Sequence, residues 1–304
     1  MKFRYRIEFW AYLLGGAMLR ALPLRTSQRL AAAAARATFR LGGKRVRWTL
    51  ANLRLAYPDA TEGELSEIGR KSFVHFAWNA IDIIRAEKWS DEDLRAHVDI
   101  VGLEELRKLL DQGRGALLLT PHVGCFDLGL RLFSLELPDC LPAAVSRPLK
   151  NPLIARRLIG FRTGRGAELI PHKRVTARRM LRVLRDGRPI SVMSDQYSSR
   201  SRGVFVPLFG VRCSSSAGPA TISLRANVPI VVCYVVRDAP DHHAVYISAP
   251  LEIRTSGDRK RDIEAVTAQC NAAFEEVIRR HPEQWLWGHR RFRHSPDLAV
   301  DPYR

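Results

Sequence analysis

The chain has 304 residues, 46% of them hydrophobic, and a formal net charge of +18 at pH 7. A chain of this length buries a substantial core, and the lack of any internal repeat or low-complexity block excludes a repeat array. The charge makes anionic partners the expectation, whether nucleic acid, acidic protein or phosphate-bearing lipid, without selecting among them.

The cysteines and histidines give no sign of a disulfide framework or a metal site. Neither a C-x-x-C pair nor a metal-ligand spacing occurs, so we expect no metal, no organic cofactor, and reduced cysteines in a protein that faces the cytoplasm. His242 and His243 follow a Pro-Asp dipeptide, where a solvated turn is predicted. The five cysteines are Cys125, Cys140, Cys213, Cys233 and Cys270.

Residues 9–19, FWAYLLGGAML, form an apolar run between two clusters of basic residues. The run has eleven residues, which is shorter than the ~20 that a spanning helix needs. No small-residue cleavage site follows it, which argues against a signal peptide. We therefore predict an interfacial membrane anchor over residues 1–25, ahead of a main domain over residues 26–304. A buried first helix is the alternative.

The next segment is rich in helix-forming residues. Residues 27–48 combine alanine with arginine, and Gly42-Gly43 is expected to break the helix. Thr61 and Glu64 have the spacing of a capping box, so another helix is predicted to begin there.

From residue 98 onward, short apolar runs alternate with segments of helical periodicity. This alternation predicts an α/β fold with a largely parallel sheet flanked by helices. Strands are expected at 98–101, 116–120, 141–145, 190–193, 230–236 and 244–249. Helices are expected at 104–112, 126–136, from Pro152, around 177–184, from Ser214-Ser215-Ser216, and over 263–277.

The central stretch is ALLLTPHVGCFD, residues 116–127. Its apolar part is typical of a buried parallel strand, which places His122 in the turn beyond the strand and Asp127 in the following helix. Ligands bind at this edge of open α/β sheets. An aspartate that accepts a hydrogen bond from one imidazole nitrogen leaves the other free to deprotonate a hydroxyl. The spacing alone favours a simpler alternative to a catalytic pair, in which His122 caps the helix and Asp127 lies in solvent.

Asp195 follows another predicted strand, so its side chain is expected at the same edge of the sheet as His122. A strand-end carboxylate of this kind either orients a substrate hydroxyl or an arginine, or caps the next turn. Arg162 and Arg165 flank Thr163-Gly164 on a glycine-rich loop. Guanidinium groups suit bidentate phosphate binding, and a solvated basic loop is the alternative.

Several of these motifs together resemble the late acyltransferases of lipid A biosynthesis, the lauroyl and myristoyl transferases within the glycerolipid acyltransferase superfamily. The most specific stretch is HPEQWLWGHRRFR, residues 281–293. The resemblance covers nearly the whole chain; the other matching stretches are His122-x4-Asp127, NLRLAYPD at 52–59, Asp195-Gln196 and GVFVPLFG at 203–210. Glutamate is more common in that family at the position of Asp127.

The resemblance implies a glycerolipid-acyltransferase-like fold and a membrane-associated acyltransferase at the cytoplasmic face of the inner membrane. In this reading His122 and Asp127 are the catalytic pair, while Arg162, Arg165 and Asp195 bind substrate. The donor is an acyl thioester of acyl carrier protein or coenzyme A, a co-substrate rather than a cofactor. The acceptor is an anionic saccharide lipid.

Two rival functions remain. One is acylation of another acceptor, a glycerol phosphate or a mannosylated inositol lipid. The other, from a different class, is nucleic-acid binding, which the charge permits; however, the arginines are spread over helices and loops and match no binding module, so we expect no nucleic-acid partner. The tail, with Trp285, Trp287 and His289, is expected to face lipid headgroups, contact substrate phosphates or brace the active-site rim.

Overall fold

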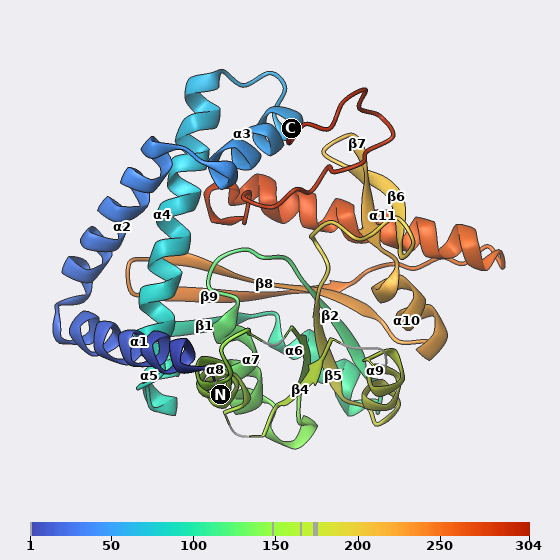
Figure 1. Ribbon diagram of the computed structural model, residues 1–304. Helices are drawn as coiled ribbons and strands as arrows, with labels where there is room; N and C mark the ends of the chain where they lie inside the picture. Colours follow the sequence, from blue (N-terminus) through green and yellow to red (C-terminus); the bar gives the residue numbers. More distant parts are fainter. Residues whose placement is uncertain (1, 148, 165, 173–175) are drawn as a thin grey trace.

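The computed structural model describes residues 2–147, 149–164, 166–172 and 176–304. A seven-stranded sheet in the order β1-β9-β8-β2-β5-β3-β4 forms its centre, and β6 and β7 form a separate hairpin (Figure 1). Neighbouring strands in the large sheet run parallel except for β8 and β9. The predicted α/β fold with a largely parallel sheet is thus confirmed.

The strands are β1 (Val98–Val101), β2 (Ala116–Thr120), β3 (Ala143–Ser146), β4 (Glu168–Pro171), β5 (Pro189–Met193), β6 (Gly203–Leu208), β7 (Val211–Ser216), β8 (Ile230–Ala239) and β9 (His242–Pro250). The helices are α1 (Phe3–Ala21), α2 (Leu24–Leu41), α3 (Lys44–Ala56), α4 (Glu62–Ala86), α5 (Asp91–His97), α6 (Leu103–Asp111), α7 (Asp127–Glu136), α8 (Pro152–Thr163), α9 (Thr176–Arg185), α10 (Gly218–Ala226) and α11 (Arg259–Arg280).

The strand β2 is buried on both faces, which explains its unbroken apolar sequence. Leu117 and Leu119 belong to the core that also contains Phe274 of α11. Leu118 points to the opposite face, into the core that contains Leu128 of α7. Side chains alternate between the faces of a strand, so a parallel strand between two helical layers needs apolar residues at every position.

The predicted helix boundaries in the N-terminal part are confirmed. Gly42 and Gly43 separate α2 from α3, and both have positive φ angles, 76° and 120°. Thr61 caps α4 in a capping box with Glu64.

Two predictions about local structure are wrong. Ser214-Ser215-Ser216 does not begin a helix, because it pairs with β6 as the end of β7, and α10 begins only at Gly218. His243 does not lie in a solvated turn; it is 1% exposed in β9, with Nε2 3.3 Å from Asp82. Pairing with the preceding strand in the first case, and contact with distant α4 in the second, outweighs local preference.

One face of α1 packs against the rest of the protein, and the other is exposed. Asn151 Nδ2 donates to the carbonyl oxygen of Tyr5 over 2.9 Å, and Tyr12 donates to Glu87. In the described part of the chain, no helix combines the length and hydropathy needed to cross a bilayer. Instead, large apolar side chains are exposed at intervals of three or four residues along α1: Phe3, Ile7, Trp10, Leu14 and Met18.

Candidate active site

The site lies where β2 and β5 end. These strands are parallel neighbours, and Thr120 of β2 pairs with Met193 of β5. His122 and Asp195 each follow their strand by two residues, so the shared register brings them side by side at the carboxyl edge of the sheet. This is the edge at which open α/β sheets bind ligands.

His122 contacts Asp195 through two hydrogen bonds. The ring nitrogen Nδ1 lies 2.6 Å from Oδ1, and the backbone amide of His122 donates to Oδ2 over 2.9 Å. The Asp195 side chain is 1% exposed, whereas that of His122 is 19% exposed. The carboxylate is therefore buried behind a partly accessible imidazole.

The charge state of Asp195 determines the tautomer of His122. Burial raises the pKa of this carboxyl group. Its attraction to His122 and its hydrogen bonds from His122 and Trp285 have the larger, opposite effect, and the pKa falls to about 2. An ionised carboxylate can only accept hydrogen bonds, so Nδ1 holds a proton, and in the neutral form of the imidazole Nε2 presents a lone pair. The Gln196 side-chain nitrogen lies 3.4 Å from Nε2.

The C-terminal tail completes the site from a distant part of the sequence. Trp285 donates its indole Nε1–H to Oδ2 of Asp195 over 2.7 Å. The backbone amide of Leu286 donates to the carbonyl oxygen of His122 over 3.1 Å, and Val123 forms a β-bridge with Trp285. Of the three roles expected for the tail, these contacts support bracing of the active-site rim.

Other residues of the tail are also buried. Arg291 is 1% exposed and donates to the carbonyl oxygen of Ser214 and to Ser215 Oγ. His289 has its pKa lowered to about 4, mainly by burial, while the charge of Asp195 opposes this effect. At pH 7 the imidazole of His289 is therefore neutral.

The turn that contains His122 is fixed at Gly124. This residue has φ +55°, and a Cβ there would collide with the carbonyl oxygen of Val235, so only glycine fits. Its amide donates to Gln284 O over 3.0 Å, and its carbonyl oxygen accepts from Asn79 Nδ2 over 2.8 Å. Backbone contacts to α4 and the tail thus hold the loop in one conformation.

Asp127 does not contact His122, contrary to the expectation from their spacing. It is the first residue of α7, and it forms an ion pair with Arg162, whose Nε donates to Oδ1 over 2.6 Å. Arg162 also donates from Nη1 to Ser146 Oγ over 3.3 Å. The partner of the His122 ring is Asp195, and Asp127 holds an arginine beside the same edge of the sheet. Arg165 lies outside the described residues.

Cys125 is close to His122 in sequence but is not placed to act as a nucleophile. It is 1% exposed, and burial raises the pKa of its thiol well above its usual value. A thiol with a raised pKa is a poor source of thiolate. Within the four described ranges, no group of three or more His, Cys, Asp or Glu side chains has a geometry that could hold a metal ion.

Comparisons with known proteins identify the family of this chain. Residues 1–294 match the family model described as bacterial lipid A biosynthesis acyltransferase. The chain is 28% identical over 301 residues to the lipid A biosynthesis lauroyltransferase of Escherichia coli, covering 97% of this chain and 95% of that protein. It is 26% identical over 248 residues to the palmitoleoyltransferase of lipid A biosynthesis from the same organism, covering 81% and 78%.

A relative with a different acceptor in its name is similar to the same degree. The phosphatidylinositol mannoside acyltransferase of Mycolicibacterium smegmatis is 28% identical over 281 residues, covering 90% of this chain and 88% of that protein. The extent of the family match decides the assignment: the chain belongs to the bacterial lipid A biosynthesis acyltransferases.

Proposed function

We propose that the chain transfers a fatty acyl group from an acyl thioester of acyl carrier protein to a hydroxyl of an anionic saccharide lipid at the cytoplasmic face of the inner membrane. The observation that supports this most directly is the His122–Asp195–Trp285 arrangement. It supplies a general base and an orienting carboxylate, and the acceptor substrate supplies the nucleophile.

The reaction follows from the tautomer of His122. Nε2 takes the proton of the acceptor hydroxyl as its oxygen attacks the thioester carbonyl carbon. Asp195 stays ionised and stabilises the imidazolium, as in other histidine–aspartate pairs. The tetrahedral intermediate then collapses, the carbon–sulfur bond breaks, and the imidazolium returns the proton to the thiolate. No acyl-enzyme forms, which agrees with the buried, protonated thiol of Cys125.

Arg162 is proposed to bind a phosphate of the acceptor. Its contacts with Asp127 and Ser146 fix the guanidinium beside the carboxyl ends of β2 and β3. A guanidinium has five N–H donors, so donors remain for a phosphate after these contacts. Asp127 then positions Arg162 rather than His122.

Membrane association is proposed to occur through the exposed apolar residues of α1. Trp10, Leu14 and Met18 are 68%, 66% and 63% exposed, so burial in the lipid interface would remove a large apolar area from water. The arginines near the ends of this helix would meet anionic headgroups.

The acceptor class is tested with two purified lipids and either of two acyl donors. Labelled acyl groups are offered on acyl carrier protein or on coenzyme A, together with a lipid A precursor or a phosphatidylinositol mannoside. We expect transfer to the lipid A precursor. Transfer to the phosphatidylinositol mannoside alone would show that the mannoside, and not a lipid A precursor, is the acceptor. Transfer to neither lipid would reject the proposed reaction.

A further inference from the structure

A cavity lies away from the candidate active site. It has a volume of about 480 Å³ and lies between α2, α4 and the turn that joins β8 to β9. This volume is in the range of small-molecule sites. Its polar lining includes Arg25, Arg29, Arg36, His75, Trp78 and Arg237. Neither His122 nor Asp195 contributes to it.

Three of the lining arginines have no acidic partner. Arg25, Arg29 and Arg36 follow one another at intervals of four and seven residues, so they share one face of α2. All three are exposed, and none forms an ion pair with any residue that the structure describes. Their charges are therefore available to a ligand.

The acidic groups near the cavity already have partners. Asp82 forms a buried ion pair with Arg237 and also faces His243. Asp238 accepts from His242 Nδ1 over 2.8 Å. Asp238 itself lines the cavity, so one carboxylate lies beside the three unpaired arginines of α2, and the cavity keeps an excess of positive charge.

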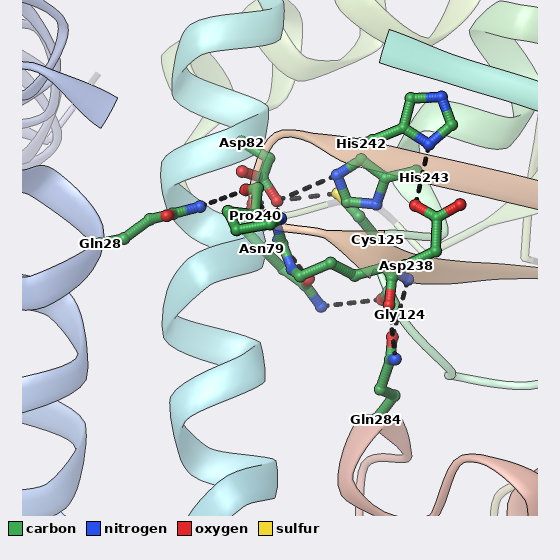
Figure 2. A network of polar contacts seen from close by, with 11 residues as sticks. Gln28, Asn79, Asp82, Gly124, Cys125, Asp238, Pro240, His242, His243 and Gln284 are labelled. Carbon is green, nitrogen blue, oxygen red and sulfur yellow. Dashed lines mark hydrogen bonds and ion pairs between the residues drawn. The ribbon is translucent and has the colours of Figure 1, made fainter. Parts of the chain in front are cut away.

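The walls of the cavity are tied together by contacts that leave these three arginines free. Gln28 reaches from α2 to the carbonyl oxygen of Pro240 in the β8–β9 turn (Figure 2). Trp78 Nε1 donates to the carbonyl oxygen of Gln28 over 3.0 Å, and Arg237 donates to Pro240 O over 3.0 Å. The site is consequently preformed.

Two buried nitrogen atoms at the inner end of the cavity have no hydrogen-bond partner among the described residues. Arg237 is 6% exposed, and its Nε has no partner among the described residues; the same holds for the buried Nδ1 of His75. Burial lowers the pKa of Arg237 to about 10 and that of His75 to about 4. Asp82 already pairs with the Arg237 guanidinium, but Arg237 Nε still lacks an acceptor, which an anion in the cavity would supply.

We propose that this cavity binds the phosphate-bearing headgroup of a membrane lipid, at a site separate from His122. Arginine forks suit phosphate oxygens, and an indole such as that of Trp78 suits the boundary between headgroup and acyl chains. A lipid is favoured over a soluble phosphate because α2 directly follows the exposed apolar side chains of α1 and itself exposes Leu30, 55%. The inference rests on the proposed membrane association.

The first test compares two pairs of charge-removing substitutions in the full chain. Arg29→Gln/Arg36→Gln changes the cavity, and Arg40→Gln/Arg47→Gln removes two exposed arginines that do not line it. Flotation measures binding to phosphatidylcholine vesicles with and without phosphatidylglycerol. On the anionic vesicles, the cavity pair should lose roughly ten times more affinity than the control pair. Equal losses would mean that binding depends only on diffuse charge and would overturn the proposal.

The second test distinguishes a lipid from a free ion. Calorimetric titration of the wild-type chain uses inorganic phosphate and, separately, short-chain phosphatidylglycerol below its micelle concentration. The short-chain lipid should bind more tightly, and the cavity pair should not bind it. Tighter binding of inorganic phosphate would overturn the lipid assignment.

An activity measurement separates this inference from the proposed function. With donor and acceptor in detergent, the cavity pair should transfer acyl groups at the wild-type rate. If the cavity pair loses acyl transfer in detergent, these arginines belong to the acceptor site, and the proposal of a separate lipid site is overturned. If the wild type transfers no acyl group but the vesicle result holds, the proposed reaction fails and the lipid site remains.

Discussion

Trp285 donates its indole N–H to Oδ2 of Asp195 across 90 residues of sequence. The same oxygen accepts the backbone amide of His122, and the second carboxylate oxygen contacts the imidazole. The orientation of the proposed base therefore depends on a side chain from the tail, as well as on the two strands that end at the site.

Asp195→Asn should lower kcat about as much as His122→Ala, by roughly 10²- to 10⁴-fold. The amide has no negative charge to stabilise the imidazolium, and it can donate to Nδ1 and so favour the wrong tautomer. The measurement is transfer of a labelled acyl group from acyl carrier protein to a lipid A precursor, with circular dichroism as the folding control. Wild-type turnover by His122→Ala would reject the mechanism.

Asp127→Asn should act through Arg162, not through His122. We expect a higher acceptor KM in Asp127→Asn and in Arg162→Ala, with a smaller change in kcat than in Asp195→Asn. Loss of a charge-assisted hydrogen bond to phosphate costs about 1.5–3 kcal/mol. Steady-state kinetics with varied acceptor separates the two parameters. If Asp127→Asn lowered kcat as much as Asp195→Asn and left the acceptor KM unchanged, Asp127 would act on His122 and not on Arg162.

Trp285→Phe keeps an aromatic ring but removes the donor to Asp195. This variant should lose about 1.5–3 kcal/mol of interaction with the carboxylate, with a reduced kcat and a higher pKa of Asp195. Trp287→Phe is the matched control, since the Trp287 indole donates to the carbonyl oxygen of Pro282 instead. Equal kcat values in the two variants would show that the tail acts only by packing.

The lowered pKa of Asp195 makes part of the folding stability depend on pH. The pKa falls from 3.8 in the unfolded chain to about 2 in the folded protein, which corresponds to roughly 2 kcal/mol. A depressed carboxyl pKa stabilises the fold above the unfolded value, and the contribution disappears as the pH falls through the folded value. Urea unfolding at about pH 5 and at about pH 2.5 measures it. The stability gap between wild type and Asp195→Asn should narrow at the lower pH, and a constant gap would contradict the assignment.

Polar substitutions on the exposed face of α1 should release the protein from membranes. Leu14→Gln/Met18→Gln removes two exposed apolar side chains, each worth about 1.5–3 kcal/mol when buried. Leu41→Gln/Val300→Gln changes two side chains that are equally apolar and 87% and 72% exposed elsewhere. Membrane sedimentation should drop in the first pair only. If both variants sediment with membranes to the same extent, α1 does not anchor the chain.

The sequence predicts the placement of His122 and Asp195 well, because each follows an apolar run whose length and composition define a buried strand. Parallel strands then bring their carboxyl ends to one edge, so the meeting of the two residues follows from the fold class. The pairing of Asp127 could not be predicted in the same way. Spacing sets its distance along the chain, but the contact between α7 and α8 directs its side chain to Arg162.

The errors elsewhere have a related cause. Three serines before Ala-Gly-Pro are a good local signal for a helix start, yet Ser214 and Ser215 pair with β6 and accept hydrogen bonds from Arg291. The sequence does not select among the three roles expected for Trp285, since nothing near it in sequence identifies its acceptor. Contacts between distant segments decide these positions, and periodicity does not describe them.

The dependence of the His122 turn on the tail also has a consequence for synthesis of the protein. The ribosome makes the turn and both of its strands long before Gln284, Trp285 and Leu286, which supply its remaining backbone and carboxylate contacts. A nascent chain can thus form much of the sheet while its histidine loop is still incomplete. Under the proposed mechanism the tail must dock before His122 is fully oriented, so we expect acyl transfer to begin only at the end of synthesis.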